Sequence, residues 1–237
     1  MSASARPIAF ICAMPMELRP ITRRLGLRKQ RIGDAEVRAG TLGGKGVVGI
    51  VTGMGTKLAT AGTERLLDAL SVERVVVVGI TGALENETPI GTLIVPATVL
   101  DSATGAEYTP DPIGDVAPQG TMHTADVIVT DPDDLAKLRA AGVVSLDMET
   151  AAIAAVCERR QVAWSVFRVI SDRASDGSID EETFKMSNQD GTPNPVAVAR
   201  YFLRHPGSMP RLATLAKGAT LAANTAADAA IRACAQI

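Results

Sequence analysis

Four acidic side chains stand where apolar segments of the chain begin or end, and a carboxylate in such a place can do chemistry on a bound molecule. Glu17 and Asp172 each follow an apolar run, and Asp147 and Glu149 open an Ala-rich segment. Such groups can act as a general base, accept hydrogen bonds from hydroxyl groups or, if burial raises the pKa, donate a proton. The ordinary alternatives are a solvated first-turn residue for Glu17, a helix N-cap for Asp147, and an N-cap or Asx turn for Asp172.

Two glycine turns could bring a ligand close to the backbone. Gly53-Met54-Gly55 precedes a helical segment, but Leu58 breaks the GxGxxG pattern of phosphate-binding loops, so a plain tight turn is favoured. The segment Gly79-Ile80-Thr81-Gly82-Ala83 ends the most apolar run of the chain. Glycines there fit either close approach of a ligand or packing of a helix on a sheet, and the residues alone favour neither.

The histidines and cysteines form no recognisable ligand pattern. His123 and His205 are far apart, and the three cysteines are widely spaced without a CxxC. We therefore expect no metal site and no disulfide framework, which fits a reducing, cytoplasmic location. The sequence also has no GxSxG, GxxxxGK[ST] or HExxH motif, which disfavours a serine hydrolase, a nucleoside triphosphatase or a zincin.

Composition bounds the class of protein. The chain has 237 residues, 46% of them apolar, with 24 Lys and Arg against 26 Asp and Glu. This balance predicts a globular protein, a single domain over residues 1–237, with no nucleic acid as partner. We expect no membrane insertion, because the N-terminal apolar run over 8–16 is shorter than the roughly 20 residues that a bilayer requires.

The elements that must position the candidate residues follow a β-α-β-α order. Apolar runs typical of strands buried on both faces lie at residues 8–12, 47–51, 74–80, 92–99, 127–130 and 162–170. Helical patterns lie at residues 16–25, 57–70, 147–160 and 209–235. This order predicts an α/β fold with a central mixed, largely parallel β-sheet flanked by helices, and ligands bind such sheets beyond the carboxyl ends of the strands.

Two loops are candidates for a role in function, one as a cover over a site and the other as part of the site itself. Residues 101–124 are the least regular part of the chain, and a flap over a ligand and a surface excursion explain them equally well. The polar stretch 171–180 follows an apolar strand, which places it where ligands bind in open α/β sheets.

Four segments, in this order, resemble the nucleoside phosphorylase and nucleosidase superfamily, especially its methylthioadenosine/S-adenosylhomocysteine nucleosidases. They are Ala13-Met14-Pro15-Met16-Glu17, the glycine segment from Gly79 with Ile90-Gly91-Thr92-Leu93-Ile94-Val95, Asp147-Met148-Glu149-Thr150-Ala151-Ala152-Ile153-Ala154, and Val169-Ile170-Ser171-Asp172-Arg173-Ala174. The resemblance spans about residues 8–185. It implies an enzyme that cleaves the N-glycosidic bond of a purine nucleoside through an oxocarbenium-like transition state, with no cofactor besides water, and that forms a homodimer.

The resemblance also implies roles for individual residues. Glu17 would activate water and Asp172 would protonate or hydrogen bond N7 of the base, which makes these two the catalytic residues. Glu149 would accept hydrogen bonds from the ribose hydroxyls, and Met148 would pack under the sugar. The predicted substrate-binding residues are Ala13, Ile80, Thr81, Gly82, Asp147, Met148, Glu149, Ser171 and Phe184.

Departures from the family pattern keep alternatives open. Val77 stands where related phosphorylases carry an arginine, and a carboxylate at Glu17 would repel phosphate, so hydrolysis is favoured over phosphorolysis. Arg19, Arg23 or an arginine of a partner chain could supply the missing cation. The family's serine is replaced by Ile80, and its stacking aromatic is absent, which leaves Phe184 or Tyr108 to contact the base. The substrate could therefore be methylthioadenosine, S-adenosylhomocysteine, another purine nucleoside or futalosine, and a non-catalytic nucleoside-binding protein is the remaining alternative.

Overall fold

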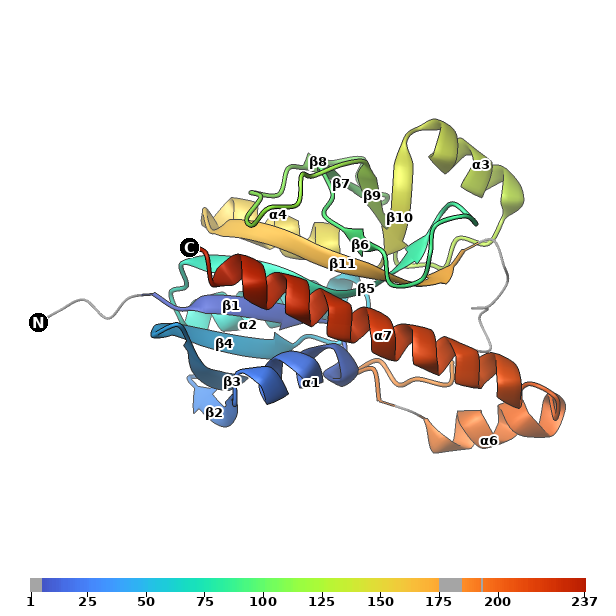
Figure 1. Cartoon of the computed structure of the whole chain (residues 1–237), viewed down its shortest axis with the longest axis horizontal. Coiled ribbons are helices and arrows are strands. Elements are labelled where there is room, and N and C mark those ends of the chain that lie inside the picture. Colours follow the sequence, from blue (N-terminus) through green and yellow to red (C-terminus); the bar gives the residue numbers. More distant parts are fainter. Residues whose placement is uncertain (1–5, 175–184, 193) are drawn as a thin grey trace, which may run out of the picture.

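Parallel strands form the centre of the fold (Figure 1). The computed structural model describes residues 6–174, 185–192 and 194–237. The central strands are β1 (Ile8–Cys12), β4 (Lys45–Val51), β5 (Arg74–Ala83) and β11 (Ala163–Arg173). β1 lies between β4 and β5, and β11 pairs with the whole length of β5. Consecutive residues of β1 pack into different cores, Ile8 and Phe10 into one and Ala9 and Ile11 into the other, as expected for a strand buried on both faces.

Further strands extend this centre on both sides. On one side, β2 (Arg28–Ile32) and β3 (Ala35–Leu42) form an antiparallel hairpin against β4. On the other side lie β6 (Leu93–Ile94), β7 (Thr98–Asp101), β8 (Glu107–Tyr108), β9 (Thr121–Thr124) and β10 (Val143–Asp147). The described strands make one eleven-stranded sheet, in the order β2-β3-β4-β1-β5-β10-β9-β7-β8, with β11 and β6 off this path.

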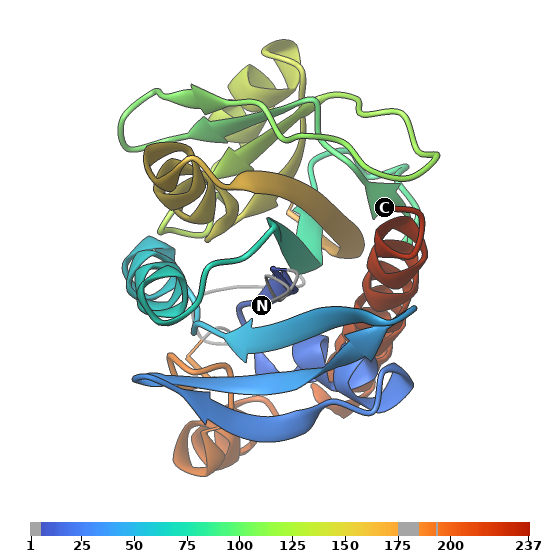
Figure 2. The ribbon, with the colours of Figure 1, turned by 90° about the vertical axis from the view of Figure 1, so that its left-hand side faces the viewer.

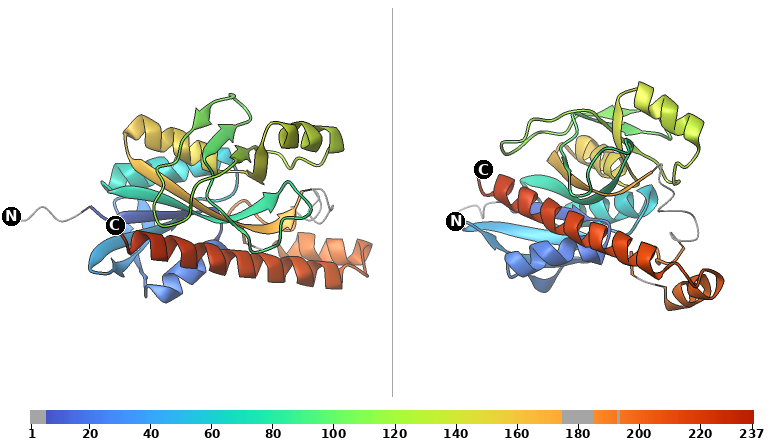
Figure 3. Two further views of the ribbon diagram at one scale, coloured as in Figure 1. Left: turned by 45° about the horizontal axis from the view of Figure 1, so that its top comes forward. Right: turned by 45° about the vertical axis from the view of Figure 1, so that its right-hand side comes forward.

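Helices cover both faces of the sheet (Figure 2). α2 (Thr56–Ala69) and α4 (Thr150–Arg160) pack on one face, and α1 (Pro15–Arg24) and α7 (Met209–Cys234) pack on the other. α3 (Pro132–Ala140) follows β9, and α6 (Pro195–Arg204) lies beside the N-terminal end of α7, as Figure 3 shows. This arrangement confirms the predicted α/β fold with a mixed, partly parallel sheet between helices.

Three predicted elements need correction. Residues 127–130 are not a strand, because the chain leaves the sheet after β9 and Val127 is 70% exposed. The predicted strand over 92–99 is two short strands, β6 and β7, because Pro96 between them has no N–H to donate to a sheet. The helix predicted from Asp147 begins at Thr150, since Asp147 is the last residue of β10.

The irregular stretch 101–124 is a surface excursion for most of its length. Asp111, in its middle, accepts hydrogen bonds from Arg74 and Ser165, and its N–H donates to the carbonyl of Trp164. Arg74 and Trp164 lie at the amino ends of β5 and β11, away from the carboxyl ends where ligands bind in such sheets. Of residues 101–124, His123 alone lines the cavity described below.

Candidate active site

A gap in the pairing of β5 creates a cavity at the carboxyl end of the sheet. On the side of β5 opposite β11, the pairing with β1 ends at Val77 and the pairing with β10 begins at Gly82. The carboxyl half of β5 therefore borders a crevice between β1 and β10, which is the kind of switch point where ligands bind in open α/β sheets. A cavity of about 440 Å³ occupies this position.

The predicted site residues gather around this cavity. The ones that the structure describes all line it: Ala13, Glu17, Ile80, Thr81, Gly82, Asp147, Met148, Glu149, Ser171 and Asp172. Phe184 lies outside the described residues. Tyr108, the other candidate for stacking on the base, packs against a hydrophobic core from β8 and does not line the cavity.

Arg168 is a residue of this site that the sequence analysis missed. It is 1% exposed, and its guanidinium is 2.7 Å from the carboxylate of Asp147, 3.2 Å from that of Glu149 and 3.6 Å from that of Glu17. The signal was present, because Arg168 is a lone cation inside the apolar run 162–170, and a charge is buried only with partners. Arg19 and Arg23 of α1 do not line the cavity, whereas Arg168 of β11 does.

Glycine at position 79 makes room for this ion pair. Gly79 is opposite Arg168 in the register of β5 and β11. A Cβ atom on Gly79 would collide with the carboxylate of Glu17 and with the guanidinium of Arg168. Gly79, the first glycine of the predicted loop, therefore allows the side chains of Glu17 and Arg168 to approach the β5 backbone. The space that it leaves is used by these protein groups rather than by a ligand.

Glu17 is a buried carboxylate held by two backbone donors. It is 1% exposed, its Oε1 accepts the N–H of Ile80 at 2.9 Å and its Oε2 accepts the N–H of Met14 at 2.8 Å. Burial raises the pKa of Glu17, while Arg168 and the backbone N–H groups act in the opposite direction. Each oxygen still has a lone pair for a further hydrogen bond, so the group is fixed in place yet able to accept a proton.

Glu149 lies at the start of α4 and bridges two parts of the site. It occupies the N-cap position rather than projecting from the first turn, and its Oε1 accepts the N–H of Gly55 at 2.9 Å. Gly53 and Gly55 have φ values of 98° and 90°, so the predicted tight turn is present, and its N–H binds a carboxylate of the protein itself. Burial is the largest cause that raises the pKa of Glu149, to about 7, and Asp147 adds to the rise.

Asp147 is held entirely by neighbouring protein groups. Its Oδ1 accepts the hydroxyl of Thr124 at 2.6 Å, and its Oδ2 accepts the backbone N–H of Thr150 at 3.0 Å and Arg168 at 2.7 Å. These contacts join β9, β10, β11 and the start of α4. The Asp147 carboxylate therefore fixes the position of the Arg168 guanidinium. We expect Asp147 to affect a ligand only through Arg168.

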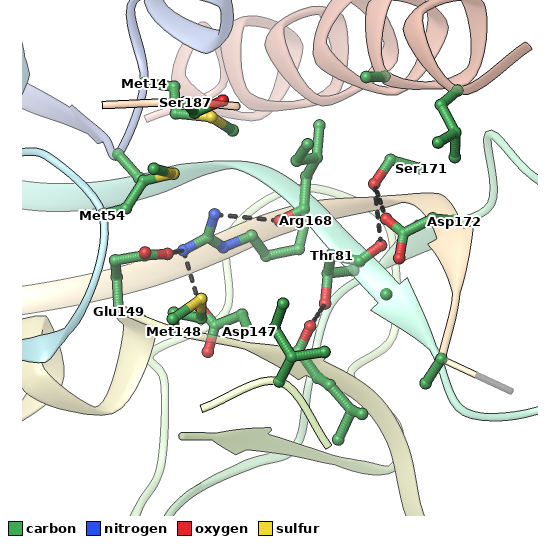
Figure 4. A pocket seen from close by; sticks show the side chains of 18 of the residues that line it. Met14, Met54, Thr81, Asp147, Met148, Glu149, Arg168, Ser171, Asp172 and Ser187 are labelled. Atoms are coloured by element: carbon green, nitrogen blue, oxygen red, sulfur yellow. Dashed lines mark hydrogen bonds and ion pairs between the residues drawn. The ribbon is translucent and has the colours of Figure 1, made fainter. Parts of the chain in front are cut away.

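Asp172 lies at the other end of the cavity from Glu149, as Figure 4 shows. The register of β11 shifts between Ile170 and Asp172, a bulge that brings Asp172 opposite Gly82 of β5. Asp172 is thus part of the strand rather than an N-cap or an Asx turn. The hydroxyl of Ser171 hydrogen bonds its Oδ1, and its Oδ2 lies 3.2 Å from the place that a Cβ of Gly82 would take.

The rest of the wall is apolar. Met14 and Met54 lie at the end of the cavity where Glu149 is, and the backbone of Gln189 accepts the N–H of Met54 at 2.8 Å (Figure 4). Leu212 and Leu215 of α7 close another side. A ligand here meets carboxylates at two places and apolar atoms elsewhere, the pattern of a site for a small organic molecule.

A metal centre and a membrane-spanning helix are both absent from the part of the chain that is described. No group of three or more His, Cys, Asp or Glu side chains is arranged to hold a metal ion within residues 6–174, 185–192 and 194–237. Over the same residues, none of the helices combines the length and the apolar character that crossing a bilayer requires.

Comparison with known proteins gives related sequences. A model of the Phosphorylase superfamily matches residues 7–118 and 113–204. The 5'-methylthioadenosine/S-adenosylhomocysteine nucleosidase of Shewanella denitrificans is 27% identical over 209 residues, which cover 75% of this chain and 91% of that protein. The protein of the same name from Shewanella oneidensis is 28% identical over 202 residues, which cover 72% of this chain and 86% of that protein.

Solved structures share the fold at lower identity. A mutant of the Helicobacter pylori 5'-methylthioadenosine nucleosidase, with 5'-methylthioadenosine in its active site, has a TM-score of 0.74 at 16% identity and covers 98% of this chain and 100% of its own. The futalosine hydrolase of Helicobacter pylori has a TM-score of 0.73 at 16% identity, with 98% of this chain and 99% of its own covered.

Proposed function

Because the chain belongs to the Phosphorylase superfamily, we propose that it hydrolyses the N-glycosidic bond of a purine nucleoside to a free base and a ribose derivative. The observation that carries this proposal is that two separate carboxyl groups line one cavity, Glu17, buried beside Arg168, and Asp172 at the carboxyl end of β11. One can serve the attacking water and the other the leaving base, as glycosidic hydrolysis requires.

The attacking group in this proposal is water activated by Glu17. Its carboxylate takes one proton as the water oxygen forms a bond to the anomeric carbon, and the bond from that carbon to the base nitrogen breaks. The raised pKa of Glu17 makes it a stronger base than an exposed carboxylate, and the two backbone N–H donors fix its direction.

Departure of the base is the task of Asp172. As the glycosidic bond breaks, its electron pair passes into the base, and a proton or a strong hydrogen bond at N7 stabilises that charge. Asp172 lies over Gly82, which has no side chain to occupy the space in front of the carboxyl group. The hydroxyl of Ser171 orients this carboxyl group through its hydrogen bond to Oδ1.

The ribose lies between these two groups in the proposed complex. Glu149 accepts hydrogen bonds from the sugar hydroxyls, and Met148 packs against the sugar ring. The Oε2 atom of Glu149 has Arg168 at 3.2 Å and retains a lone pair for a hydroxyl. The remaining predicted contacts, Ala13, Ile80, Thr81 and Gly82, supply the wall on the β1 and β5 sides, with Asp147 acting through Arg168.

The electrostatics of the cavity favour hydrolysis over phosphorolysis. Arg168 is the cation nearest the proposed position of attack, but it is already shared by Glu17, Asp147 and Glu149. A phosphate dianion would meet the carboxyl groups of Glu17, Asp147 and Glu149 with one guanidinium between them, and each of these groups that is ionised repels it strongly in a buried site.

The substrate that we propose is methylthioadenosine, S-adenosylhomocysteine or a similar nucleoside. The names of the curated relatives support this choice, and the apolar wall formed by Met14, Met54 and Leu212 suits an apolar group at the 5' position. The likeness in fold to a futalosine hydrolase keeps futalosine in the set to be tested.

We also propose that the protein works as a cytoplasmic homodimer. Val196 and Leu203 of α6 are 68% and 86% exposed in the single chain, and with Pro195 and Ala199 they form an apolar patch that a second copy of the chain would cover. Light scattering coupled to size-exclusion chromatography measures the mass directly. A monomer at micromolar concentration would contradict this part of the proposal.

Release of free base from a nucleoside panel tests the reaction. The panel contains methylthioadenosine, S-adenosylhomocysteine, adenosine, inosine, guanosine and futalosine, each in phosphate-free buffer and again with added phosphate. We expect release without phosphate and no ³¹P signal from a sugar 1-phosphate when phosphate is present. Release only with phosphate would establish a phosphorylase, and tight binding without turnover would establish a nucleoside-binding protein.

A further inference from the structure

His123 is a polar side chain of the cavity for which the proposed reaction has no use. It lines the cavity from β9 and is 8% exposed. Its Nδ1 atom is buried and has no hydrogen-bond partner among the described residues. Leaving a buried polar atom unpaired costs about 1 to 3 kcal/mol, so a cavity-lining side chain with such an atom, unpartnered among the described residues, is suited to bond a molecule bound in the cavity.

The alternation of β9 directs this side chain toward the cavity. Met122 packs in the core between the sheet and α4, and the Thr124 hydroxyl donates to Asp147 on that same face. Because successive side chains of a strand point to opposite faces, His123 points away from that core. It lies beside Leu146, its partner in the register of β9 and β10, and Leu146 also lines the cavity.

A row of four residues crosses the sheet at this level. Asp172 of β11 is opposite Gly82 of β5, Gly82 is opposite Leu146 of β10, and Leu146 is opposite His123 of β9. Residues in register share a face, so Asp172 and His123 mark the two ends of one row. Three inter-strand spacings of about 4.8 Å separate their Cα atoms by roughly 14 Å.

The middle of this row can hold a flat apolar group. Gly82 has no side chain, and Leu146 offers an apolar surface, so neither competes for hydrogen bonds with what lies above them. The span suits a two-ring base between a carboxyl group and an imidazole, each reaching toward the centre. A single ring held by Asp172 would leave His123 without a contact.

We propose that His123 is a specificity-determining residue that hydrogen bonds a ring nitrogen in the six-membered ring of the purine, at the edge away from Asp172. The inference rests on the proposed function, because Asp172 must hold the five-membered ring of the base. Burial lowers the pKa of His123, so near pH 7 its ring is neutral, with one nitrogen donating and the other accepting.

Binding of the free bases tests this proposal independently of catalysis. The affinities of adenine, 1-deazaadenine and 3-deazaadenine are measured by calorimetry for the wild type and for His123→Leu. In the wild type we expect one of the two deaza bases, in which C–H replaces a ring nitrogen, to bind about tenfold more weakly than adenine. In His123→Leu the three bases should bind with equal affinity. Equal affinities in the wild type, or discrimination that survives in the variant, would overturn the proposal.

Two further variants separate recognition from a structural role. His123→Gln keeps a hydrogen-bonding group and should retain part of the discrimination, while His205→Leu changes an exposed histidine outside the cavity and should leave all three affinities unchanged. Because Nδ1 has no partner among the described residues, His123→Leu should not lower the melting temperature. A lower melting temperature with unchanged discrimination would assign His123 to the fold instead.

The same measurements show whether the reaction or the recognition fails. If the wild type binds adenine selectively through His123 but releases no base from any nucleoside, the proposed hydrolysis is wrong and the inference about His123 stands. If the wild type hydrolyses methylthioadenosine and its deaza analogues equally well, with no effect of His123→Leu, the inference alone is wrong.

Discussion

At the scale of single residues, the cavity joins four charged side chains that would be costly to bury separately. Glu17, Asp147 and Glu149 surround Arg168, and every one of these groups is buried. With three carboxylates sharing one guanidinium, burial outweighs attraction at Glu17 and Glu149, and the pKa of each is raised. The cluster therefore provides carboxyl groups able to exchange protons nearer to neutral pH than exposed ones.

Replacement of Asp172 should impair departure of the base and leave the rest of the site intact. Asp172→Asn cannot donate a carboxyl proton, so we expect release of adenine from methylthioadenosine to slow by roughly 100-fold or more. The control is 4-nitrophenyl riboside, whose leaving group needs no proton. Its hydrolysis by the variant should stay within a few-fold of the wild type. An equal loss on both substrates would place Asp172 outside the leaving-group role.

The raised pKa of Glu149 predicts a pH dependence of stability. Between its ordinary pKa of 4.5 in the unfolded chain and about 7 in the folded protein, the folded state binds more protons. The contribution of Glu149 to the free energy of unfolding is thus fully present below pH 4.5, and it is lost as the pH rises through about 7. We expect the melting temperature to fall over this range, and to fall less in Glu149→Gln, which mimics the protonated form. The exposed Glu87→Gln is the control, and an unchanged slope in Glu149→Gln would contradict the assignment.

At the scale of elements, the carboxyl ends of the strands position the candidate residues. The strands that are buried on both faces could be predicted from the sequence. The runs of β1, β4, β5 and β11 and the helices α1, α2 and α7 follow directly from apolar periodicity. The hairpin Arg28–Leu42 was not predicted, because β2 is mostly exposed and its residues are polar. Arg168 was missed for a different reason. The carboxylates that pair with it come from β10 and α1, and they become its neighbours only in the folded protein.

The contact between β5 and the charged cluster should not tolerate a side chain at position 79. Gly79→Ala places a methyl group where the Glu17 carboxylate and Arg168 meet, and overpacking of this kind costs about 1 to 3 kcal/mol. We expect a lower midpoint of urea unfolding and a strong loss of base release. Gly207→Ala is the matched control, because no atom lies within 4 Å of the added Cβ and it should leave both quantities near the wild type. A Gly79→Ala protein with normal stability and activity would refute the contact.

At the scale of the whole molecule, the fold leaves a crevice where β1 and β10 diverge from β5, and the described residues predicted to be catalytic or substrate-binding meet there. The helices of both faces contribute to its closure, α4 through Glu149 and α7 through Leu212 and Leu215. Membership of the Phosphorylase superfamily agrees with this architecture. The proposed hydrolysis by activated water depends on Glu17, which lines this crevice.

The most direct test is base release from methylthioadenosine by the wild type and by Glu17→Gln, measured side by side in phosphate-free buffer under single-turnover conditions. We predict rapid release of adenine by the wild type and a loss of roughly 100-fold or more in the variant, with binding of the nucleoside retained. Comparable rates for both proteins, or release by the wild type only after phosphate is added, would contradict the claim that Glu17 activates water.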